Sequence, residues 1–408
     1  MRVILATLGS FGDINPFIWM GRVLRSSGNE VIFIANPYFE EMIKKEAFDF
    51  YPAGTLEDYN QATIPAVRTG SRFRDQGEAI QASRRLFNCM FMKPAMEIYN
   101  IIYELKNQET LILNHFYAYG AKLAAEKHSI PSWNVCLSPY WLKAFRRITS
   151  FPAFMEGKMM KGTNKFIDGQ LFTKPMNKNR AEIGLPSLEK SSIEWMFEGD
   201  NLCLFPDWFI GYQLIGSLNV DYIGFPDPSS DGKALSVEMA EFLKAHDKPV
   251  VFTPGSAFRD VGRFFEAAAV ALEKLKKPGI FLTRHIEAIP KKLPDNIIHA
   301  DFVPLEQVLG QCSALVHHGG VGTCYQAIKA GIPQVVCWRM GEQKENARVP
   351  KEMGICRTIA YKDVSGEAMY QNIKALLNDA EVQVKCDKVS ERVNSRSSED
   401  TLRTLLSR

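Results

Sequence analysis

The chain has 408 residues, of which 46% are hydrophobic and 23% charged, and a formal net charge of +3. These values are ordinary for a two-domain globular protein, and so small a charge argues against nucleic acid as a partner. No apolar run approaches the ~18 residues of a membrane-spanning helix. Eight cysteines, none in a CxxC pair, and the absence of a signal-peptide pattern favour a reducing, cytoplasmic location.

The first half of the chain predicts alternating strands and helices, the pattern of a parallel sheet. A strand is expected over residues 3–8, followed by a glycine-containing turn over 9–13 and a helix over 16–27 that Gly28 ends. The further elements expected in this half are strands over 30–35, 110–113 and 132–136 and helices over 67–107 and 119–128.

A segment rich in Pro, Gly, Ser and Asp then predicts a linker, and a second alternation follows it. The elements expected there are strands over 250–253, 279–283, 297–300, 314–317 and 333–337 and helices over 262–275, 305–309 and 323–329. The chain is therefore predicted as an α/β protein with an N-terminal domain over 1–212, a linker over 213–232 and a C-terminal domain over 233–390. A last helix within 391–408 has no strand after it, so we expect it to pack back on the N-terminal domain.

One stretch of the first half is strongly basic. Residues 141–180 contain nine Lys or Arg but only two acidic residues, together with several Phe and Met. Such a composition is compatible with peripheral contact to the inner face of an anionic membrane. A solvated loop and helix beside a pocket are the alternative, since charge patterning alone does not decide between them.

The most informative motif is HHGGVGT at residues 317–323. It follows a predicted strand, its glycines allow the backbone to approach a ligand closely, and a helix begins near Thr323. The free N–H groups and positive dipole end of that helix form an anion site. His318 and Thr323 can bond phosphate oxygens, and Gln326, on the same helix face, can reach a ribose hydroxyl. A glycine-rich turn with core histidines is the alternative.

Residues 318–326 resemble the donor signature of family 1 nucleotide-sugar glycosyltransferases, and the resemblance covers most of the chain. It implies the GT-B fold, in which two Rossmann-like domains have parallel sheets facing across a cleft. It also implies contacts to the donor from Gly12, Gly255, Ser256, Phe302, Val303, Gln307, His318, Gly320, Gly322, Thr323, Gln326, Glu342 and Gln343.

Three of these positions carry particular implications. Phe302 takes the place of the aromatic ring that stacks on the nucleotide base, and Glu342 takes the place of an acid, usually Asp, that binds sugar hydroxyls. Gln326 stands where plant-type members have a Glu that binds the ribose. The resemblance therefore leaves uridine and thymidine diphosphate both open as the carrier.

Residues 9–16, GSFGDINP, resemble the GSxGDxxP motif of bacterial and sterol-type members, where Asp replaces the catalytic His of plant-type enzymes. Sugar transfer needs a base to take the proton of the acceptor hydroxyl, and the resemblance assigns this role to Asp13. Burial beside apolar acceptor atoms strengthens a carboxylate as a base. Asp13 can also act as a cap of the helix near Pro16. His115, in a strand-to-helix loop, is a second candidate base.

Aromatic and Met side chains in the first half suit an apolar acceptor, and Phe116, Tyr140 and Trp141 are predicted to contact it. The segments 203–209 and 224–226 resemble the bacterial lipid-acceptor branch, which includes the rhamnosyltransferases of rhamnolipid synthesis and sterol glucosyltransferases. A lipid, aromatic or polyketide-like acceptor is therefore expected, with glycolipids or secondary metabolites as products.

The predicted activity is an inverting, metal-independent transfer from a UDP- or dTDP-linked sugar, with no cofactor. Two alternatives stay open: a sugar-nucleotide epimerase of the same fold, which needs no acceptor, and a non-catalytic sugar-nucleotide-binding protein, which does not need Asp13. A nicotinamide dehydrogenase is disfavoured because Gly9 and Gly12 lack the third glycine of GxGxxG. The sugar, the acceptor and the oligomeric state are not predicted.

Overall fold

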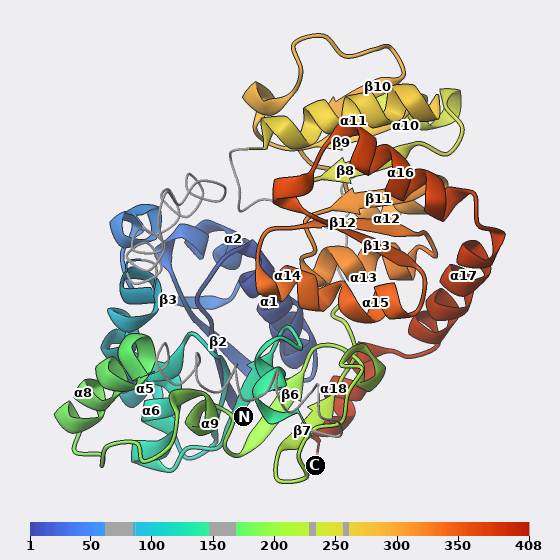
Figure 1. The fold of residues 1–408 in the computed structure, drawn as a ribbon. Coiled ribbons are helices and arrows are strands. Elements are labelled where there is room, and N and C mark those ends of the chain that lie inside the picture. Colours follow the sequence, from blue (N-terminus) through green and yellow to red (C-terminus); the bar gives the residue numbers. More distant parts are fainter. Residues whose placement is uncertain (62–84, 86, 147–168, 228–233, 256–260, 408) are drawn as a thin grey trace. The chain divides into compact units, whose positions relative to one another are not determined.

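The computed structural model describes residues 1–61, 85, 87–146, 169–227, 234–255 and 261–407, which form two compact units (Figure 1). The first unit contains the described residues up to Pro226 together with the segment from Ser398 onward. The second unit runs from Asp227 to Ser397. Each unit has one sheet in which all the described strand pairs are parallel, so the α/β prediction is confirmed.

The first unit has a seven-stranded sheet in the order β3-β2-β1-β4-β5-β6-β7. Its strands are β1 (Arg2–Ala6), β2 (Glu30–Ala35), β3 (Asp49–Pro52), β4 (Thr110–His115), β5 (Ser132–Cys136), β6 (Asp200–Cys203) and β7 (Asn219–Tyr222). Val3 to Ala6 of β1 are all fully buried. Such continuous apolar runs are typical of strands covered on both faces.

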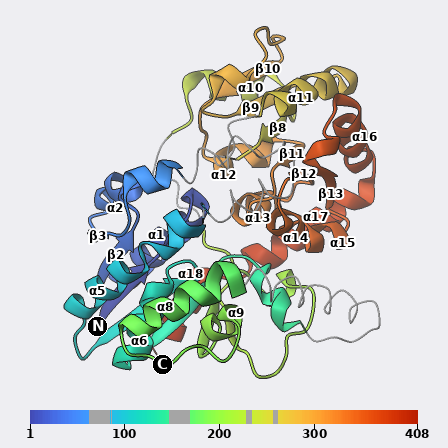
Figure 2. The same ribbon diagram turned by 60° about the vertical axis from the view of Figure 1, so that its left-hand side comes forward.

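Helices cover this sheet. They are α1 (Phe11–Ser26), α2 (Glu40–Lys45), α5 (Ala95–Leu105), α6 (Tyr119–His128), α8 (Lys174–Glu182), α9 (Ser192–Met196) and α18 (Ser398–Leu406). Helices α5 and α6 lie side by side (Figure 2). At their contact a Cβ atom on Gly120 would lie 1.9 Å from the carbonyl oxygen of Ala95. Only glycine therefore permits this close helix approach.

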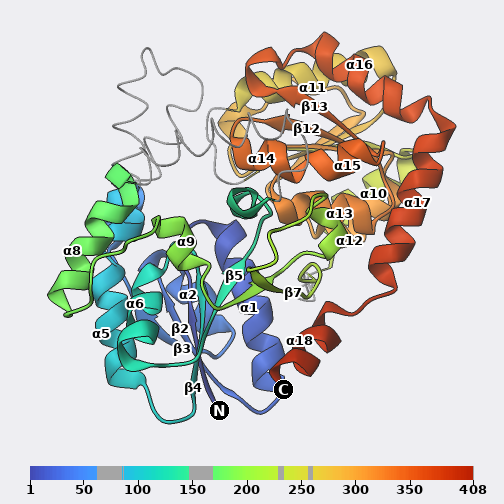
Figure 3. The same cartoon turned by 60° about the horizontal axis from the view of Figure 1, so that its bottom comes forward.

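Two elements of the first unit lie outside the range 1–212 predicted for the N-terminal domain. Strand β7 lies inside the predicted linker over 213–232 and pairs with β6 at the edge of the sheet. Helix α18 lies alongside α1 (Figure 3). Its Arg403 donates hydrogen bonds to the hydroxyl oxygens of Ser26 and Ser27, both at 2.6 Å, and its Leu402 is fully buried.

The second unit has a six-stranded sheet in the order β10-β9-β8-β11-β12-β13. Its strands are β8 (Val250–Thr253), β9 (Gly279–Leu282), β10 (Ile297–Ala300), β11 (Ala314–His317), β12 (Gln334–Trp338) and β13 (Cys356–Ala360). Its helices are α10 (Val237–Ala245), α11 (Gly262–Leu275), α12 (Leu305–Val308), α13 (Val321–Lys329), α14 (Gly341–Asn346), α15 (Arg348–Glu352), α16 (Gly366–Leu377) and α17 (Ala380–Asn394). Helix α17 extends past residue 390, the predicted end of this domain.

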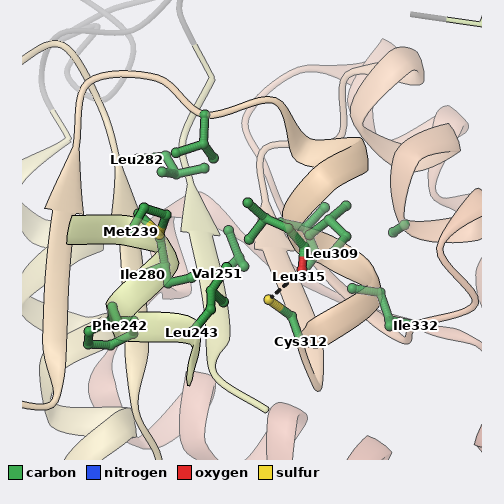
Figure 4. Close-up of a cluster of buried hydrophobic side chains, with 13 residues drawn as sticks. Met239, Phe242, Leu243, Val251, Ile280, Leu282, Leu309, Cys312, Leu315 and Ile332 are labelled. Carbon is green, nitrogen blue, oxygen red and sulfur yellow. Dashed lines mark hydrogen bonds between the residues drawn. The ribbon is translucent and has the colours of Figure 1, made fainter. Parts of the chain in front are cut away.

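A buried cluster joins helices α10 and α12 to strands β8, β9 and β11 (Figure 4). Met239 of α10 packs with Val251 and Ile280 of the sheet, and the Sγ atom of Cys312 donates to the carbonyl of Val308 at 3.2 Å. Val303, which precedes α12, belongs to the same cluster. The core therefore fixes the backbone at one of the positions predicted to bind the donor.

Within the described part of the chain, no helix has both the length and the apolar character to span a bilayer. Most of the basic stretch over 141–180 lies outside the described residues, as does much of the helical segment predicted over 67–107. Peripheral contact with a membrane therefore stays a prediction.

Candidate active site

Each sheet reverses its strand order at one point, and predicted site residues gather at both points. The order reverses between β1 and β4 in the first sheet and between β8 and β11 in the second. Open α/β sheets bind ligands at the carboxyl ends of strands at such a reversal. Asp13 follows β1 and His115 ends β4, whereas Gly255 follows β8 and His318 follows β11.

Helix α13 has an amino end without a capping side chain. It begins at Val321, after Gly320 in extended geometry, rather than at Thr323 as predicted, and its first turn carries no acid. Such a helix end can bind an anion through the amide groups of its first turn. Gly322 is exposed and Thr323 half-buried in the same turn.

The imidazole ring of His318 is held between two glycines. A Cβ atom on Gly255 would lie 2.6 Å from Cε1 of the ring, and one on Gly320 would lie 2.6 Å from Nε2. Burial lowers the pKa of His318 to about 4, so the ring is neutral at physiological pH. Its Nδ1 atom is enclosed and has no hydrogen-bond partner among the described residues. One polar atom of the ring thus lacks a hydrogen-bond partner within the described part of the chain.

Phe302 and Val303, which are predicted to bind the nucleotide base, follow strand β10. The side chain of Phe302 is 63% exposed, whereas Val303 beside it is buried in the core. The aromatic ring is thus presented from a fixed backbone, as stacking on a base requires. Gln307 is half-buried on α12, and Ser256 lies outside the described residues.

The predicted sugar-binding pair lies at the start of α14. The Oε1 atom of Gln343 accepts hydrogen bonds from the amides of Arg339 at 2.7 Å and Met340 at 3.2 Å. Only the NH₂ group of Gln343 is therefore left to bind a sugar. Glu342 is half-buried, and Gln326 on α13 is buried, with 9% of its surface exposed.

In the first unit, Asp13 lies within α1 rather than in a loop before it. The helix begins at Phe11, and Oδ2 of Asp13 accepts hydrogen bonds from the Ser10 amide at 2.6 Å and hydroxyl at 3.0 Å. This is a capping box, which starts the helix earlier than residue 16. Asp13 therefore does help to cap a helix, but from its third position with Ser10 as the N-cap, and not as the residue before a helix near Pro16. Exposed Gly12 lies in the same turn.

His115 is buried beside this carboxylate. Its Nδ1 atom lies 3.1 Å from the carbonyl oxygen of Leu8, which can only accept, so Nδ1 carries the proton of the neutral ring. The unprotonated Nε2 atom then lies 3.9 Å from Oδ1 of Asp13. Burial lowers the pKa of His115, although the Asp13 charge and the bond to Leu8 oppose this. The two candidate bases thus form one pair.

An aromatic group borders the pair on the β4 side. The ring of Tyr117 lies edge-on to His115, with centroids 5.0 Å apart, and stacks on Phe91 at 3.9 Å. Of the predicted acceptor residues, Phe116 is buried under Trp141, with centroids 4.6 Å apart, and Tyr140 meets Trp141 edge-on at 5.3 Å.

A second aromatic group lies on the β2 side. Tyr38 is exposed, stacks on Tyr59 with centroids 4.5 Å apart, and meets Phe11 of α1 edge-on. The pKa of Tyr59 is raised by burial and, more weakly, by the charges of Tyr38 and Asp13. Asp13 is therefore close enough to this group to interact with it electrostatically.

Sequence reasoning missed Ser10 and Tyr117. The spacing of Ser10 and Asp13 is that of a capping box and could have identified the first. Tyr117 follows His115 by two residues, but its place beside the imidazole depends on the turn after β4, for which the sequence gives no signal.

The fold is that of GT-B glycosyltransferases. The structure resembles that of the glycotransferase of kitacinnamycin, with a TM-score of 0.77 at 17% identity, over 99% of this chain and 97% of that one. It also resembles glycosyltransferase VinC in complex with dTDP, with a TM-score of 0.70 at 17% identity, over 100% of this chain and 98% of that one.

Sequence comparison agrees with this class. The family model of the erythromycin biosynthesis protein CIII-like C-terminal domain matches residues 280–402. The vancomycin aglycone glucosyltransferase of Amycolatopsis orientalis is 25% identical over 379 residues, which cover 87% of this chain and 85% of that protein. These matches support glycosyl transfer as the general activity. None of the three proteins is named for a lipid acceptor, so the resemblance to the lipid-acceptor branch stays a prediction.

Proposed function

We propose that the protein is an inverting glycosyltransferase that moves a sugar from a UDP- or dTDP-linked donor to a hydroxyl of a small apolar acceptor. The anion site at the start of α13 supports this proposal most directly. There, amides without a capping side chain adjoin the His318 ring, which Gly255 and Gly320 hold in place.

On the donor side, the diphosphate binds the first turn of α13 and His318. Negative charge grows on the leaving diphosphate as the bond to the sugar breaks, and fixed amide dipoles stabilise it. Phe302 stacks on the base, while Glu342 and the NH₂ group of Gln343 bind sugar hydroxyls. We propose that these groups suffice without a metal ion or other cofactor, so transfer should persist in excess chelator.

On the acceptor side, Oδ1 of Asp13 takes the proton of the acceptor hydroxyl. The acceptor oxygen forms a bond to the anomeric carbon from the face opposite the diphosphate, the bond from that carbon to the phosphate oxygen breaks, and the configuration inverts. Oδ2 is a poorer proton acceptor because it already accepts hydrogen bonds from the amide and hydroxyl groups of Ser10. The bare Nε2 atom of His115 is a second proton acceptor beside Oδ1.

The aromatic groups on either side of this pair support an apolar acceptor. Tyr117 and Trp141 on one side and Tyr38 on the other offer ring surface to a planar or extended apolar molecule. Aromatic, polyketide-like and lipid alcohols all have this chemistry. One relative is named for the vancomycin aglycone.

Two experiments test the proposal. A thermal-shift screen of nucleoside diphosphates and their sugars should raise the melting temperature with UDP or dTDP, since ligands that bind only the native state stabilise it. The stabilising donor is then incubated with a panel of apolar alcohols, and products are detected by mass spectrometry. Conversion of the donor without any acceptor would instead support the epimerase. Binding without turnover on any acceptor, together with biological activity retained in Asp13→Ala, would support a sugar-nucleotide-binding protein.

A further inference from the structure

His317 is fully buried next to the donor site, yet the proposed mechanism gives it no task. Both of its ring nitrogens have partners. Nδ1 lies 3.2 Å from the amide nitrogen of Gly319, and Nε2 lies 2.9 Å from Oε1 of Gln334. A backbone amide can only donate, so Nδ1 is the bare nitrogen and Nε2 carries the proton.

The side chain of Gln334 fixes this tautomer of His317. The Nε2 atom of Gln334 donates to the carbonyl of Cys324 at 3.4 Å, which turns its Oε1 atom toward the ring. Burial, aided by the neighbouring His318, lowers the pKa of His317 to about 3. The ring therefore stays neutral at physiological pH and remains an acceptor for Gly319.

Gly319 is the point at which these contacts act. Its φ is +93°, and a Cβ atom there would lie 2.7 Å from Val336. Its amide is bound by His317, and its carbonyl accepts a hydrogen bond from Asn346 of α14 at 3.0 Å. Both peptide groups of Gly319 are therefore fixed by buried side chains, in a conformation that favours glycine.

Gly319 stands between His318 and Gly320, the residue that precedes α13. We propose that His317 is a positioning residue that holds the Gly319 peptide, so that the His318 ring and the amides of α13 are arranged before the diphosphate arrives. Pre-organisation of this kind improves affinity because less ordering is required on binding. This inference rests on the proposed function of the same site.

Two substitutions of His317 distinguish a role in positioning Gly319 from a role in core packing. In His317→Asn, the side-chain oxygen can take the place of Nδ1 and accept from Gly319, but the link to Gln334 is lost. In His317→Gln, the amide nitrogen can take the place of Nε2 and donate to Gln334, but the buried Gly319 amide loses its acceptor. Both variants remove an imidazole from the core, so both should lower the melting temperature.

Calorimetric titration with UDP and dTDP, well below the melting temperature of each variant, gives the decisive comparison. We expect His317→Gln to weaken the Kd about tenfold or more and His317→Asn to change it less than about threefold, since only His317→Gln leaves the Gly319 peptide to be ordered on binding. Equal Kd values for wild type and His317→Gln, or equal weakening in both variants, would overturn the positioning role. A wild-type protein that binds neither nucleotide would overturn the proposed function itself.

A measurement on the wild-type protein covers the case in which the variants do not fold. With ¹⁵N-labelled histidine, NMR should show His317 as the neutral tautomer protonated at Nε2. Amide exchange should show a protected Gly319 amide before any nucleotide is added. A ring protonated at Nδ1 cannot accept from Gly319, and finding one would refute the inference without any substitution.

Discussion

The Nε2 atom of His115 lies 3.9 Å from Oδ1 of Asp13. The other carboxylate oxygen, Oδ2, is held by the amide and hydroxyl groups of Ser10. The two oxygens of Asp13 therefore have separate environments, one anchoring the start of α1 and the other facing a buried neutral imidazole. A hydroxyl that gives up its proton here meets two acceptors instead of one.

Replacing Asp13 by Asn should lower turnover at least about a hundredfold, the lower end of general-base contributions, without changing donor affinity. The amide oxygen can still accept from Ser10, so the helix start should survive. Initial rates and nucleotide titrations measure the two effects. Ser10→Ala is the matched control: it weakens the cap by about 1 kcal/mol but keeps the carboxylate, so it should lower stability more than turnover. Wild-type turnover in Asp13→Asn would remove Asp13 from the mechanism.

Replacing His115 by Asn should keep the hydrogen bond to Leu8 and delete the group at Nε2. We expect turnover to fall at least about tenfold, less than for Asp13→Asn, because one acceptor of the pair remains. His115→Gln is the comparison, since its amide reaches the Nε2 position but no longer bonds Leu8. Unchanged turnover in His115→Asn, with normal stability, would show that the ring only fills space.

Gly255→Ala should weaken binding of the donor diphosphate about tenfold, as expected for the loss of one hydrogen bond to a charged group. The new methyl group would overlap the His318 ring, and the φ of +81° at Gly255 disfavours any side chain. Calorimetry with UDP or dTDP measures the change. Gly310→Ala adds a methyl group that meets no atom within 4 Å, so it should bind as the wild type does. Equal affinities in the two variants would contradict the placement of the ring.

Acid should destabilise the protein through its buried histidines. Burial lowers the pKa of His115, His317 and His318, the last two to about 3 and about 4. Histidines of the unfolded chain titrate near 6.5, so below that pH the unfolded state binds more protons and stability falls. Between pH 6.5 and 4, His317 and His318 should each remove up to about 1.4 kcal/mol of unfolding free energy per pH unit.

Urea unfolding at several pH values between 7 and 5 measures how steeply the unfolding free energy changes with pH. The slope should be shallower in His317→Asn than in the wild type, because one titrating group is gone. The same slope in both proteins would mean that His317 does not contribute to the pH dependence.

Local signals in the sequence were enough for much of the fold. The strand over Glu30–Ala35, the helix over Tyr119–His128 and the helix over Gly262–Leu275 have the predicted bounds, because apolar periodicity ends there at clear breaks. The start of α1 was missed because Pro16 resembles a helix start more than Ser10 does. Strand β7 was missed because Asn219–Tyr222 is a short, half-buried edge strand without an apolar pattern.

The candidate site was predictable in its parts but not in its assembly. The motif around His318 and the motif around Asp13 are each continuous in sequence. The approach of His115 to Asp13 depends on the pairing of β1 with β4, and the burial of Phe116 under Trp141 depends on the path after β5. The contact of Gly255 with His318 likewise requires β8 to neighbour β11. Such long-range pairings are not encoded in local periodicity.

Helix α18 joins the first unit although the whole second unit precedes it in the chain. During synthesis, the first sheet leaves the ribosome early. Helix α18, which packs against α1, emerges only after the second unit. Until then, Ser26, Ser27 and the site that buries Leu402 are uncovered on the nascent chain. The first unit is thus translated first, yet it can be completed only after the second unit has been made.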